Sequence, residues 1–354
     1  MPGVAYAVVS DGEITSMGAR GVARIGGDRQ LTPDTAFLTG SISKSFTALA
    51  VMQLVEAGKV DLDARLSDYL DGFSGRPAGA ITIRQLLSHT SGFSTLQGNT
   101  SPSQSTHGKD ALAVRVEQLE AVTPAYKPGE RWAYSNTNYQ ILGRLIEVVS
   151  GQSYQVYVAT HILQPLGMTH SFVADGKIHQ TMATGHRPWF GTEQPLPANR
   201  TDRATAPQGG IVASASDLAR YLRMMMNGKD DVLSAADKAL MMRPASKVSP
   251  FYGFGWFVDS SNGTVWHGGT SPGFETLATM IPAEEKAVIV LVNAGSGLGF
   301  EETAPLRDGI TSRALGLAND SEGSRWPLKA LFIGLVLLPI LYVLSMVWAW
   351  LCRD

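Results

Sequence analysis

Gly40-Ser41-Ile42-Ser43-Lys44-Ser45-Phe46 is the stretch on which the interpretation of this 354-residue chain depends. It places Ser41 and Lys44 three residues apart, directly before an apolar run with helical spacing. Side chains at i and i+3 share one face of a helix. In the first turn the helix macrodipole disfavours a positive charge, and partial burial would lower the lysine pKa further. Such a lysine can take the proton of a serine hydroxyl, so the pair predicts a serine nucleophile with a lysine base.

This pair does not decide the chemistry alone, because a Ser-x-x-Lys spacing arises by chance about once or twice in a chain of this length. The alternative is a capped helix with an exposed lysine. The same chemistry needs further partner groups elsewhere in the chain.

Two further stretches supply such partners. Tyr134-Ser135-Asn136 leads towards a predicted helix. A tyrosine near a lysine can share the base role or protonate a leaving group, and an asparagine offers a donor and an acceptor to a substrate amide. His267-Gly268-Gly269-Thr270 ends a strand-like run, where the glycines would let a substrate backbone approach and the imidazole could steer or polarise a carboxylate. Each stretch has a structural alternative. For Tyr134-Ser135-Asn136 it is a buried aromatic with a helix-capping asparagine, and for His267-Gly268-Gly269-Thr270 it is an ordinary turn with a histidine.

The composition bounds the class of protein. With 44% hydrophobic and 17% charged residues the chain can bury a large core in one or two compact units. Its 29 basic and 31 acidic residues nearly balance, so we expect no nucleic-acid partner. The single cysteine, Cys352, excludes an intramolecular disulfide framework. No metal-ligand motif is present, and we expect neither a metal nor another cofactor.

Hydrophobic periodicity predicts an α+β fold. Strand-like segments lie at both ends of the chain and helical segments lie between them, which indicates a sheet domain with an inserted all-helical domain. The strand-like segments are 4–9, 14–25, 252–258, 264–266, 275–281 and 287–293, and a hairpin signal, Asp11-Gly12, separates the first two. The helical segments are 63–70, 83–87, 111–119, 138–149, 154–162, 216–226 and 301–315. Two long loops, 94–110 and 187–210, are predicted to be disordered or to border a site.

The C-terminal segment differs in kind from the rest. Residues 330–351 read ALFIGLVLLPILYVLSMVWAWL, an uncharged stretch long enough to cross a bilayer, with Trp348 and Trp350 near one end. We predict a transmembrane helix here, joined by a linker at 318–329; the alternative is a buried core helix. The basic flanks determine its orientation poorly. The chain begins without a leader-like segment, so the domain is either cytoplasmic and tail-anchored or starts downstream of a signal segment, and we expect the second arrangement, with a periplasmic or extracellular catalytic domain.

Two motifs resemble other functional loops but do not fit them. Gly269-Thr270-Ser271-Pro272-Gly273 matches the G-x-S-x-G nucleophile elbow, yet the residue after that nucleophile must donate an N–H, and Pro272 has none. Gly295-Ser296-Gly297-Leu298-Gly299 is similar to a dinucleotide loop but lacks the third glycine at the required offset. We interpret the second as a flexible turn between a strand and a helix.

Taken in order along the chain, Ser41-Ile42-Ser43-Lys44, Tyr134-Ser135-Asn136 and His267-Gly268-Gly269 resemble the motifs of class C β-lactamases and their relatives. Those relatives are serine DD-peptidases, D-aminopeptidases and β-lactamase-like esterases. Further segments also resemble the family: Pro2-Gly3-Val4-Ala5, Leu86-Leu87-Ser88-His89-Thr90-Ser91-Gly92 and Gly209-Gly210-Ile211-Val212. The resemblance implies one hydrolase domain over 1–317, built from an antiparallel sheet flanked by helices and an all-helical subdomain at roughly 60–205.

The resemblance also assigns roles. Ser41 would be the acyl-accepting nucleophile, Lys44 its base and Tyr134 a second acid/base, while His89 would be structural. The substrate-binding residues would be Asn136, His267, Gly269 and Thr270, with the N–H groups of Ser41 and Thr270 forming an oxyanion hole.

Two departures from the family pattern narrow the expected branch of the family and the expected cover of the sheet. Class C β-lactamases carry Lys-Thr-Gly where this chain has His267-Gly268-Gly269, and a histidine there resembles the DD-peptidase and aminopeptidase branch. The chain also begins at the first strand, whereas the family usually has a preceding helix, so we expect one sheet face to be partly uncovered.

We therefore predict a membrane-anchored serine hydrolase acting through an acyl-Ser41 intermediate on peptides, especially peptides with D-amino acids, or on esters. The alternatives are a β-lactamase or short-chain esterase and, in a different class, a penicillin- or peptidoglycan-binding sensor without turnover. The expected partners are a small-molecule or peptide substrate and, through the C-terminal helix, the membrane; the sequence leaves the oligomeric state open.

Overall fold

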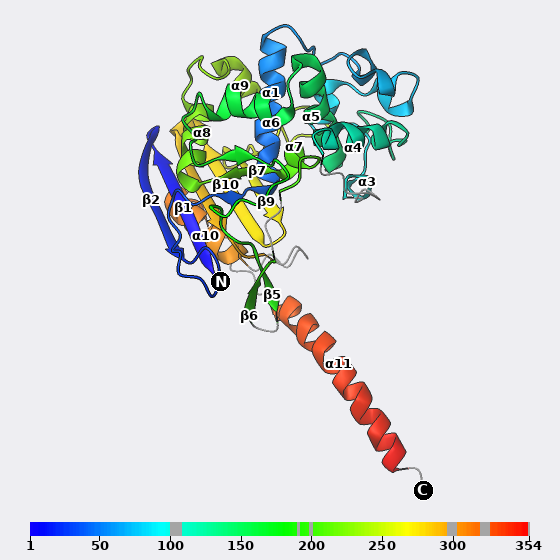
Figure 1. The fold of residues 1–354 in the computed structure, drawn as a ribbon, viewed down its shortest axis with the longest axis vertical. Coiled ribbons are helices and arrows are strands. Elements are labelled where there is room, and N and C mark those ends of the chain that lie inside the picture. Colours follow the sequence, from blue (N-terminus) through cyan, green and yellow to red (C-terminus); the bar gives the residue numbers. More distant parts are fainter. Residues whose placement is uncertain (100–107, 190–191, 198–200, 296–302, 319–325, 353–354) are drawn as a thin grey trace. The chain divides into compact units, whose positions relative to one another are not determined.

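The structure is a computed structural model that describes residues 1–99, 108–189, 192–197, 201–295, 303–318 and 326–352 (Figure 1). By internal contacts the chain divides into two compact units, Met1–Leu317 and Ala318–Asp354, and each is described here by itself.

The first unit is built on a six-stranded sheet in which every neighbouring pair is antiparallel, in the order β2-β1-β11-β10-β9-β8. The strands are β1 (Gly3–Ser10), β2 (Glu13–Gly21), β8 (Phe257–Asp259), β9 (Thr264–Ser271), β10 (Phe274–Ile281) and β11 (Lys286–Val292). Asp11 and Gly12 both have positive φ and connect β1 to β2, as the hairpin signal predicts. The predicted α+β class and the antiparallel sheet are confirmed.

Helices cover both faces of this sheet. On one face α8 (Ala215–Met226) packs against β1 and β11. On the other, α10 (Ala304–Leu315) packs against β10 and β11 and helps to bury Val288, Val290 and Val292. Side chains alternate along a strand, so an apolar run such as β11 is buried on both sides. On the α10 face of β1 the side chains of Val4, Tyr6 and Val8 are only half-buried, so this part of the sheet is partly uncovered, as expected.

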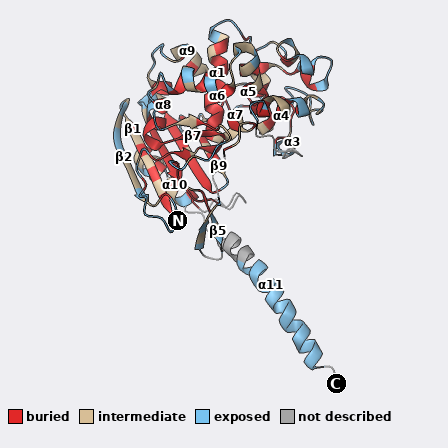
Figure 2. Ribbon diagram, in the orientation of Figure 1, coloured by how far each residue is buried: buried red, intermediate tan, exposed pale blue. Residues whose placement is uncertain are grey.

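Most of the remaining helices gather beyond one edge of the sheet around α1 (Ser43–Glu56), which is buried along most of its length (Figure 2). A helix that is apolar on most sides is stable only when neighbours surround it. α5 (Asn136–Ser150) and α7 (Ala206–Gly209) supply many of its contacts. The others are α2 (Ile83–Leu87), α3 (Thr95–Asn99), α4 (Ala111–Glu120), α6 (Tyr154–Val158) with a π-helical turn at Ala159–Leu163, and α9 (Ala235–Met241).

Two small sheets complete the unit. The first has the order β3-β7-β4, formed by β3 (Phe37–Leu38), β7 (Ile211–Ala213) and β4 (Phe172–Val173), and it holds the segment that precedes α1. The second is a hairpin of β5 (His186–Trp189) and β6 (Thr192–Pro195). The predicted loop at 187–210 is therefore wrong in part, since it contains most of this hairpin and α7; the loop at 94–110 likewise contains α3.

Several predicted elements have different boundaries in the structure. The strand predicted at 264–266 continues to Ser271, and the helix predicted at 154–162 is α-helical only to Val158. Three further differences have a visible cause. The strand predicted at 14–25 ends at Gly21, which has φ 94° and packs on the backbone of Pro2. The strand predicted at 252–258 is reduced to β8, because Gly255, with φ 78°, lies against the backbone of α1. The helix predicted at 63–70 is a short 3₁₀ turn, Leu66–Asp68, because the N–H of Leu66 bonds to the carbonyl of Ile81 rather than within a helix.

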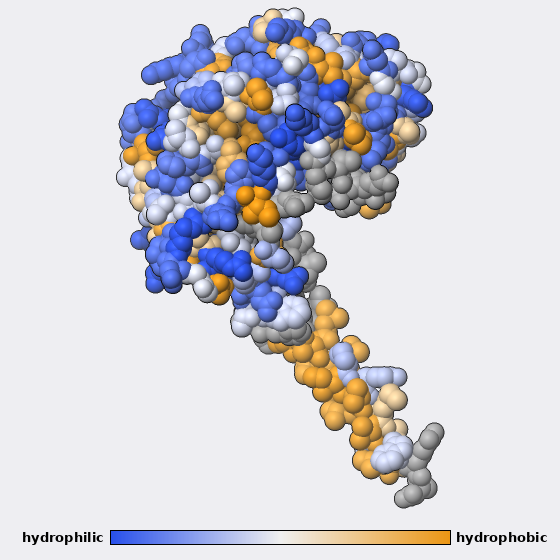
Figure 3. Space-filling model, viewed as in Figure 1, coloured by the Kyte–Doolittle hydropathy of each residue, from blue (hydrophilic) through white to orange (hydrophobic). Residues whose placement is uncertain are grey.

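The second unit contains α11 (Trp326–Leu351), in which Ile333–Leu351 is a candidate membrane span with mean hydropathy 2.1. The side chains of 333–351 are exposed and predominantly apolar (Figure 3). At about 1.5 Å of rise per residue, such a helix is long enough to cross the hydrocarbon core of a bilayer.

Candidate active site

Ser41 lies in a tight 3₁₀ turn, Gly40–Ile42, that leads from β3 into α1. Gly40 has φ 56°, and a Cβ atom there would lie 2.8 Å from the backbone nitrogen of Thr270. Glycine therefore allows the turn to approach β9 closely. The Oγ of Ser43 accepts a hydrogen bond of 2.9 Å from the N–H of Ile211, which ties the start of α1 to β7. Ser41 is thus held between a helix N-terminus and a strand.

Lys44 is fully buried one helical turn after Ser41. Its Nζ lies 3.0 Å from the Oγ of Ser41 and donates to the carbonyl oxygen of Gln208 at 2.8 Å. Burial lowers the pKa of Lys44 well below the ordinary value of 10.5, because desolvation disfavours the charged form. A neutral amine at this distance from a serine hydroxyl can accept its proton.

Tyr134 approaches the same pair from the turn before α5. The Lys44 Nζ lies 4.9 Å from the centre of its ring, and the phenol is close enough to the Ser41 side chain for that group to affect its pKa. Burial raises the pKa of Tyr134, and the nearby Ser41 side chain only partly opposes that shift. The tyrosine therefore keeps its proton, so its surroundings favour proton donation to a leaving group over the base role.

His89 packs against the turn that contains Tyr134 and Ser135. It has φ 59° and is buried, and its Nδ1 accepts a hydrogen bond of 3.2 Å from the N–H of Ser135 and lies 3.0 Å from Nδ2 of Asn138. Its ring lies 4.4 Å from that of Tyr134, centre to centre. Burial lowers the pKa of His89 well below its usual value, and its place is that of a neutral structural group.

Asn136 begins α5 and is half-buried. Its Nδ2 donates to Oδ1 of Asn99, at the end of α3, at 3.0 Å. The amide is therefore positioned by a second side chain from the segment that sequence periodicity predicted to be a loop.

β9 forms the opposite wall. Its residues from 267 onwards pair with β10, while β8 pairs with β9 only at Thr264–Trp266, so the edge of β9 beside Ser41 carries no β8 partner. Gly269 is required here, since a Cβ atom would lie 1.9 Å from the carbonyl oxygen of Thr39. Thr270 follows on the exposed end of the strand.

His267 is buried at the inner end of this wall. The Oη of Tyr252 lies 3.3 Å from its Nε2, and its Nδ1 donates to the carbonyl of Gly268 at 2.6 Å. Burial, followed by the nearby Lys44, lowers the pKa of His267 to about 3. The imidazole is therefore neutral near pH 7 and offers a substrate carboxylate no positive charge.

The site contains a pocket of about 460 Å³ beside Ser41. It is lined by Ser41, Trp132, Tyr134, Phe257, Trp266, His267, Gly268, Gly269, Thr270, Leu277, Ala304, Arg307 and Asp308. Asn136 is not among the residues that line it. Within the described part of the chain, no three His, Cys, Asp or Glu side chains are grouped to hold a metal ion.

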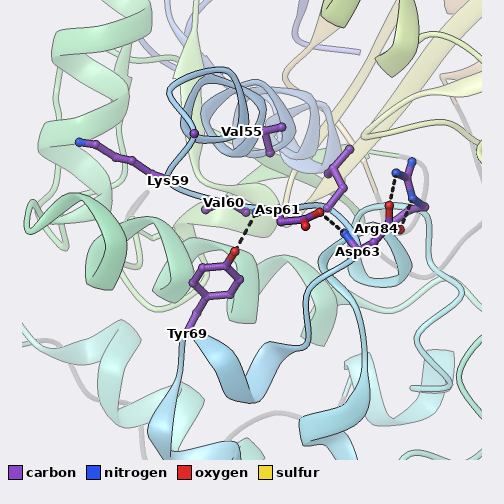
Figure 4. Close-up of a pocket in the computed structure, with 9 residues that line it drawn as sticks. Val55, Lys59, Val60, Asp61, Asp63, Tyr69 and Arg84 are labelled. Atoms are coloured by element: carbon purple, nitrogen blue, oxygen red, sulfur yellow. Dashed lines mark hydrogen bonds and ion pairs between the residues drawn. The ribbon is translucent and has the colours of Figure 1, made fainter.

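A second pocket, of about 390 Å³, lies between the end of α1 and α2 (Figure 4). Arg84 makes two hydrogen bonds to the carboxylate of Asp63, at 2.7 and 2.8 Å, and the N–H of Asp61 donates to Oη of Tyr69. Among the described lining residues there is no serine, cysteine or histidine, so this pocket has no counterpart of the Ser41 site.

The structure brings Ser41, Lys44, Tyr134, His267 and Gly269 to one place. It also adds groups that sequence reasoning missed, namely the Gln208 carbonyl, the aromatic rings of Trp132, Phe257 and Trp266, and Arg307. Gln208 directly precedes Gly209-Gly210, which resembles the family, and this position could have indicated that Gln208 lies near the site. The other contacts arise only from packing between distant segments.

The two apparent loop motifs also have a structural outcome. Ser271 ends β9 in an antiparallel hairpin whose turn is Pro272-Gly273, with φ 76° at Gly273, so it is not the nucleophile of a strand-to-helix elbow. Of Gly295–299, only Gly295 lies within the described residues.

Comparison with known proteins agrees with this geometry. The sequence model of the Beta-lactamase family matches residues 1–311. Penicillin-binding protein 4 of Amycolatopsis lactamdurans is 32% identical over 326 residues, which cover 85% of this chain and 83% of that protein.

Solved structures are similar over most of both chains. An octameric penicillin-binding protein homologue from Pyrococcus abyssi has a TM-score of 0.76 and 29% identity, covering 91% of this chain and 75% of its own. A D-stereospecific amidohydrolase from Streptomyces sp. has a TM-score of 0.66 and 25% identity, covering 86% and 93%. The chain therefore belongs to the Beta-lactamase family and is a serine hydrolase of the β-lactamase and DD-peptidase type.

Proposed function

We propose that this protein is a membrane-anchored hydrolase that forms an acyl-Ser41 intermediate from amides of D-amino acids, from peptides that contain them, or from esters. The observation that carries the proposal is the buried Lys44 amine at 3.0 Å from the Ser41 hydroxyl.

In the acylation step, Lys44 takes the proton of Ser41 while Oγ attacks the substrate carbonyl. The backbone N–H groups of Ser41 and Thr270 are the proposed donors to the oxyanion, and the close approach of Gly40 to the Thr270 nitrogen supports that role. Removing one such donor typically costs about 3–4 kcal/mol of barrier. The bond to the leaving group then breaks, Tyr134 gives that group its proton, and the proton on Lys44 restores Tyr134.

In the deacylation step, water attacks the acyl-Ser41 carbonyl and the same groups act in reverse. The water gives up a proton, Ser41 regains its hydroxyl, and the acid product leaves. Both steps balance without a cofactor.

The proposed substrate class rests on the proteins that this chain is similar to and on the motif His267-Gly268-Gly269. Its relatives include a D-stereospecific amidohydrolase and a penicillin-binding protein, and His267 stands where class C β-lactamases carry a lysine. These points favour amide, peptide or ester cleavage over β-lactam hydrolysis.

The anchor is α11, and we place the catalytic unit on the periplasmic or extracellular side, where envelope peptides are found. The length and hydropathy of Ile333–Leu351 support insertion in a membrane.

The test uses the full-length protein in detergent, a p-nitrophenyl ester, an N-acyl-D-alanine amide and a fluorescent penicillin. We expect turnover of the ester and the amide, abolished in Ser41→Ala, and a transient acyl adduct on the peptide that contains Ser41. Ser45→Ala is the matched control, since Ser45 lies in the same helix, is not among the residues that line the pocket, and donates to the carbonyl of Ile42.

Each other outcome points to a different activity. Persistent penicillin labelling without ester or amide turnover would identify a sensor, and rapid loss of the penicillin label with hydrolysed product would identify a β-lactamase. Turnover that survives Ser41→Ala would exclude the mechanism altogether.

A further inference from the structure

The pocket at Ser41 does not stop at β9 but continues over it, and Gly268 is the reason. Side chains alternate along β9, so Trp266, Gly268 and Thr270 share the face of the sheet that α10 covers. Among the described residues, a Cβ atom at Gly268 would meet only the carbonyl of Thr276, at 3.8 Å, and the ring of Trp266, at 4.0 Å. No described side chain fills the space above this glycine, and the pocket extends through it to Leu277 and α10.

The walls of this extension are aromatic. Phe257 and Trp266 stack with their ring centres 4.6 Å apart and their planes 15° from parallel. Trp132 lies 6.2 Å from Phe257, and Leu277 adds an aliphatic surface. Flat apolar groups bind well against such walls, because both partners lose apolar surface to water.

The basic residues along the described lining are already engaged. Both ring nitrogens of His267 have partners, Tyr252 and the carbonyl of Gly268. Arg307 donates to the hydroxyl of Thr303 at 3.0 Å and to the carbonyl of Thr276 at 3.2 Å, and it lies 3.5 Å from the Glu275 carboxylate. Asp308, an acidic residue, also lines the pocket. A substrate carboxylate would lose its hydration here without gaining a free cation.

The lining of the pocket also indicates which part of the substrate it holds. Tyr134, the proposed donor of a proton to the leaving group, lines it together with Ser41. The part of the substrate that departs is therefore the part that the pocket holds.

From these observations we propose that the space over Gly268 is a leaving-group subsite for a flat, uncharged group, an aryl or apolar alcohol or amine, and that it discriminates against leaving groups that carry a carboxylate. This rests on the proposed acyl-Ser41 mechanism. In the step concerned, the bond between the carbonyl carbon and the leaving oxygen or nitrogen breaks, and that atom receives the proton of Tyr134.

The first experiment compares two esters of one N-acyl-D-alanine with the full-length protein in detergent. Their leaving groups are 3-hydroxybenzamide and 3-hydroxybenzoate, which match in shape and differ by one charge. We expect kcat/KM for the carboxamide ester to be higher by about tenfold or more, equivalent to about 1.4 kcal/mol. Equal values, or a preference for the carboxylate ester, would overturn the inference.

The second experiment fills the subsite. Gly268→Val adds a β-branched side chain that suits a strand, and we expect it to lower kcat/KM for the carboxamide ester about tenfold while that for the methyl ester of the same acyl group changes less than about twofold. Gly309→Ala is the control, since Gly309 lies on α10, outside the lining, with no atom within 4 Å of its added Cβ. Equal loss on both esters in Gly268→Val would mean that the strand, not the subsite, was damaged, and would contradict the assignment.

Binding separates this inference from the catalytic proposal. In Ser41→Ala protein, 3-hydroxybenzamide is expected to bind about tenfold more tightly than 3-hydroxybenzoate, whatever the fate of the esters. Ester turnover that persists in Ser41→Ala would overturn the mechanism, whereas equal binding of the two phenols would overturn the subsite alone.

Discussion

Lys44 shows how one side chain acquires its chemistry from its surroundings. Its nitrogen is enclosed by the helix, Tyr134, Tyr139 and the Gln208 carbonyl. Desolvation therefore lowers the pKa of Lys44, and the unfolded chain, where lysine titrates near 10.5, binds the proton more strongly. Because the unfolded state holds more protons, stability rises with pH up to the unfolded pKa, and burial of this lysine reduces stability at neutral pH.

The first prediction concerns this residue. The acid limb of kcat/KM for an ester should have its midpoint well below 10.5, because the amine must be neutral in the free enzyme to accept the Ser41 proton. Lys44→Met should lower kcat/KM about 10³-fold while its unfolding temperature at pH 7 is unchanged or higher. A limb centred near 10.5, or a variant that loses its fold, would contradict this account.

His267 is the second residue whose state follows from burial. Both nitrogens have fixed partners, so the neutral form with the proton on Nδ1 is expected at every pH above about 3. Nitrogen NMR of labelled histidines, with His267→Gln to assign the signal, measures this directly. Since histidine in the unfolded chain titrates near 6.5, this group reduces stability as the pH falls from 6.5 towards 3. A cationic His267 at pH 6 would contradict the prediction.

At the scale of an element, β9 serves the site through two glycines with different functions. Gly269 lets the strand touch the turn that carries Ser41, and the Oγ1 of Thr276 on β10 donates to the same Thr39 carbonyl at 2.8 Å. Gly268, its neighbour, has room for a side chain and leaves the pocket open instead. One strand therefore contains a position where backbone contact requires glycine and another where substrate space does.

The prediction at this scale is a contrast between neighbours. Gly269→Ala places a Cβ atom 1.9 Å from the Thr39 carbonyl oxygen, so the strand and the Ser41 turn must separate. We expect a loss of about 3 kcal/mol of unfolding free energy together with loss of activity. The Cβ atom of Gly268→Ala would lie at ordinary van der Waals distances from its described neighbours. Its free energy of unfolding should therefore stay within about 0.5 kcal/mol of the wild-type value. Urea unfolding of both variants measures the difference, and equal effects would show that the contact with Thr39 is not decisive.

At the scale of the whole molecule, the residues of the site come from one compact unit, Met1–Leu317. The last residues of α10 still belong to that unit, since Leu315 is buried in the second apolar cluster and Leu317 packs against it. The apolar helix begins beyond it, so anchoring and chemistry are expected to be separable.

The corresponding prediction is a truncation after Ala318. The shortened protein should leave the membrane fraction and remain in solution without detergent, with kcat/KM for esters within about twofold of the full chain. Fractionation and ester assays on both proteins provide the measurement. If the shortened protein stays with membranes, α11 is not the main anchor.

The sequence by itself determined the chemical groups of this protein and many of its elements. Local periodicity places α5, α8 and β11, because side-chain alternation and helix spacing are local properties. The Ser41–Lys44 pair is likewise local, since i and i+3 share a helix face.

Only the tertiary structure decided the state of those groups and the shape of the space around them. The neutral Lys44 and His267 depend on desolvation by segments that lie far away in sequence. The pocket over Gly268 is formed between β9, the paired strand β8 and α10. The same dependence explains the misplaced ends at Gly21 and Gly255, where contact with distant backbone ended a strand that the local pattern would have continued. Burial and long-range packing are sums over the whole fold, so no short stretch of sequence contains them.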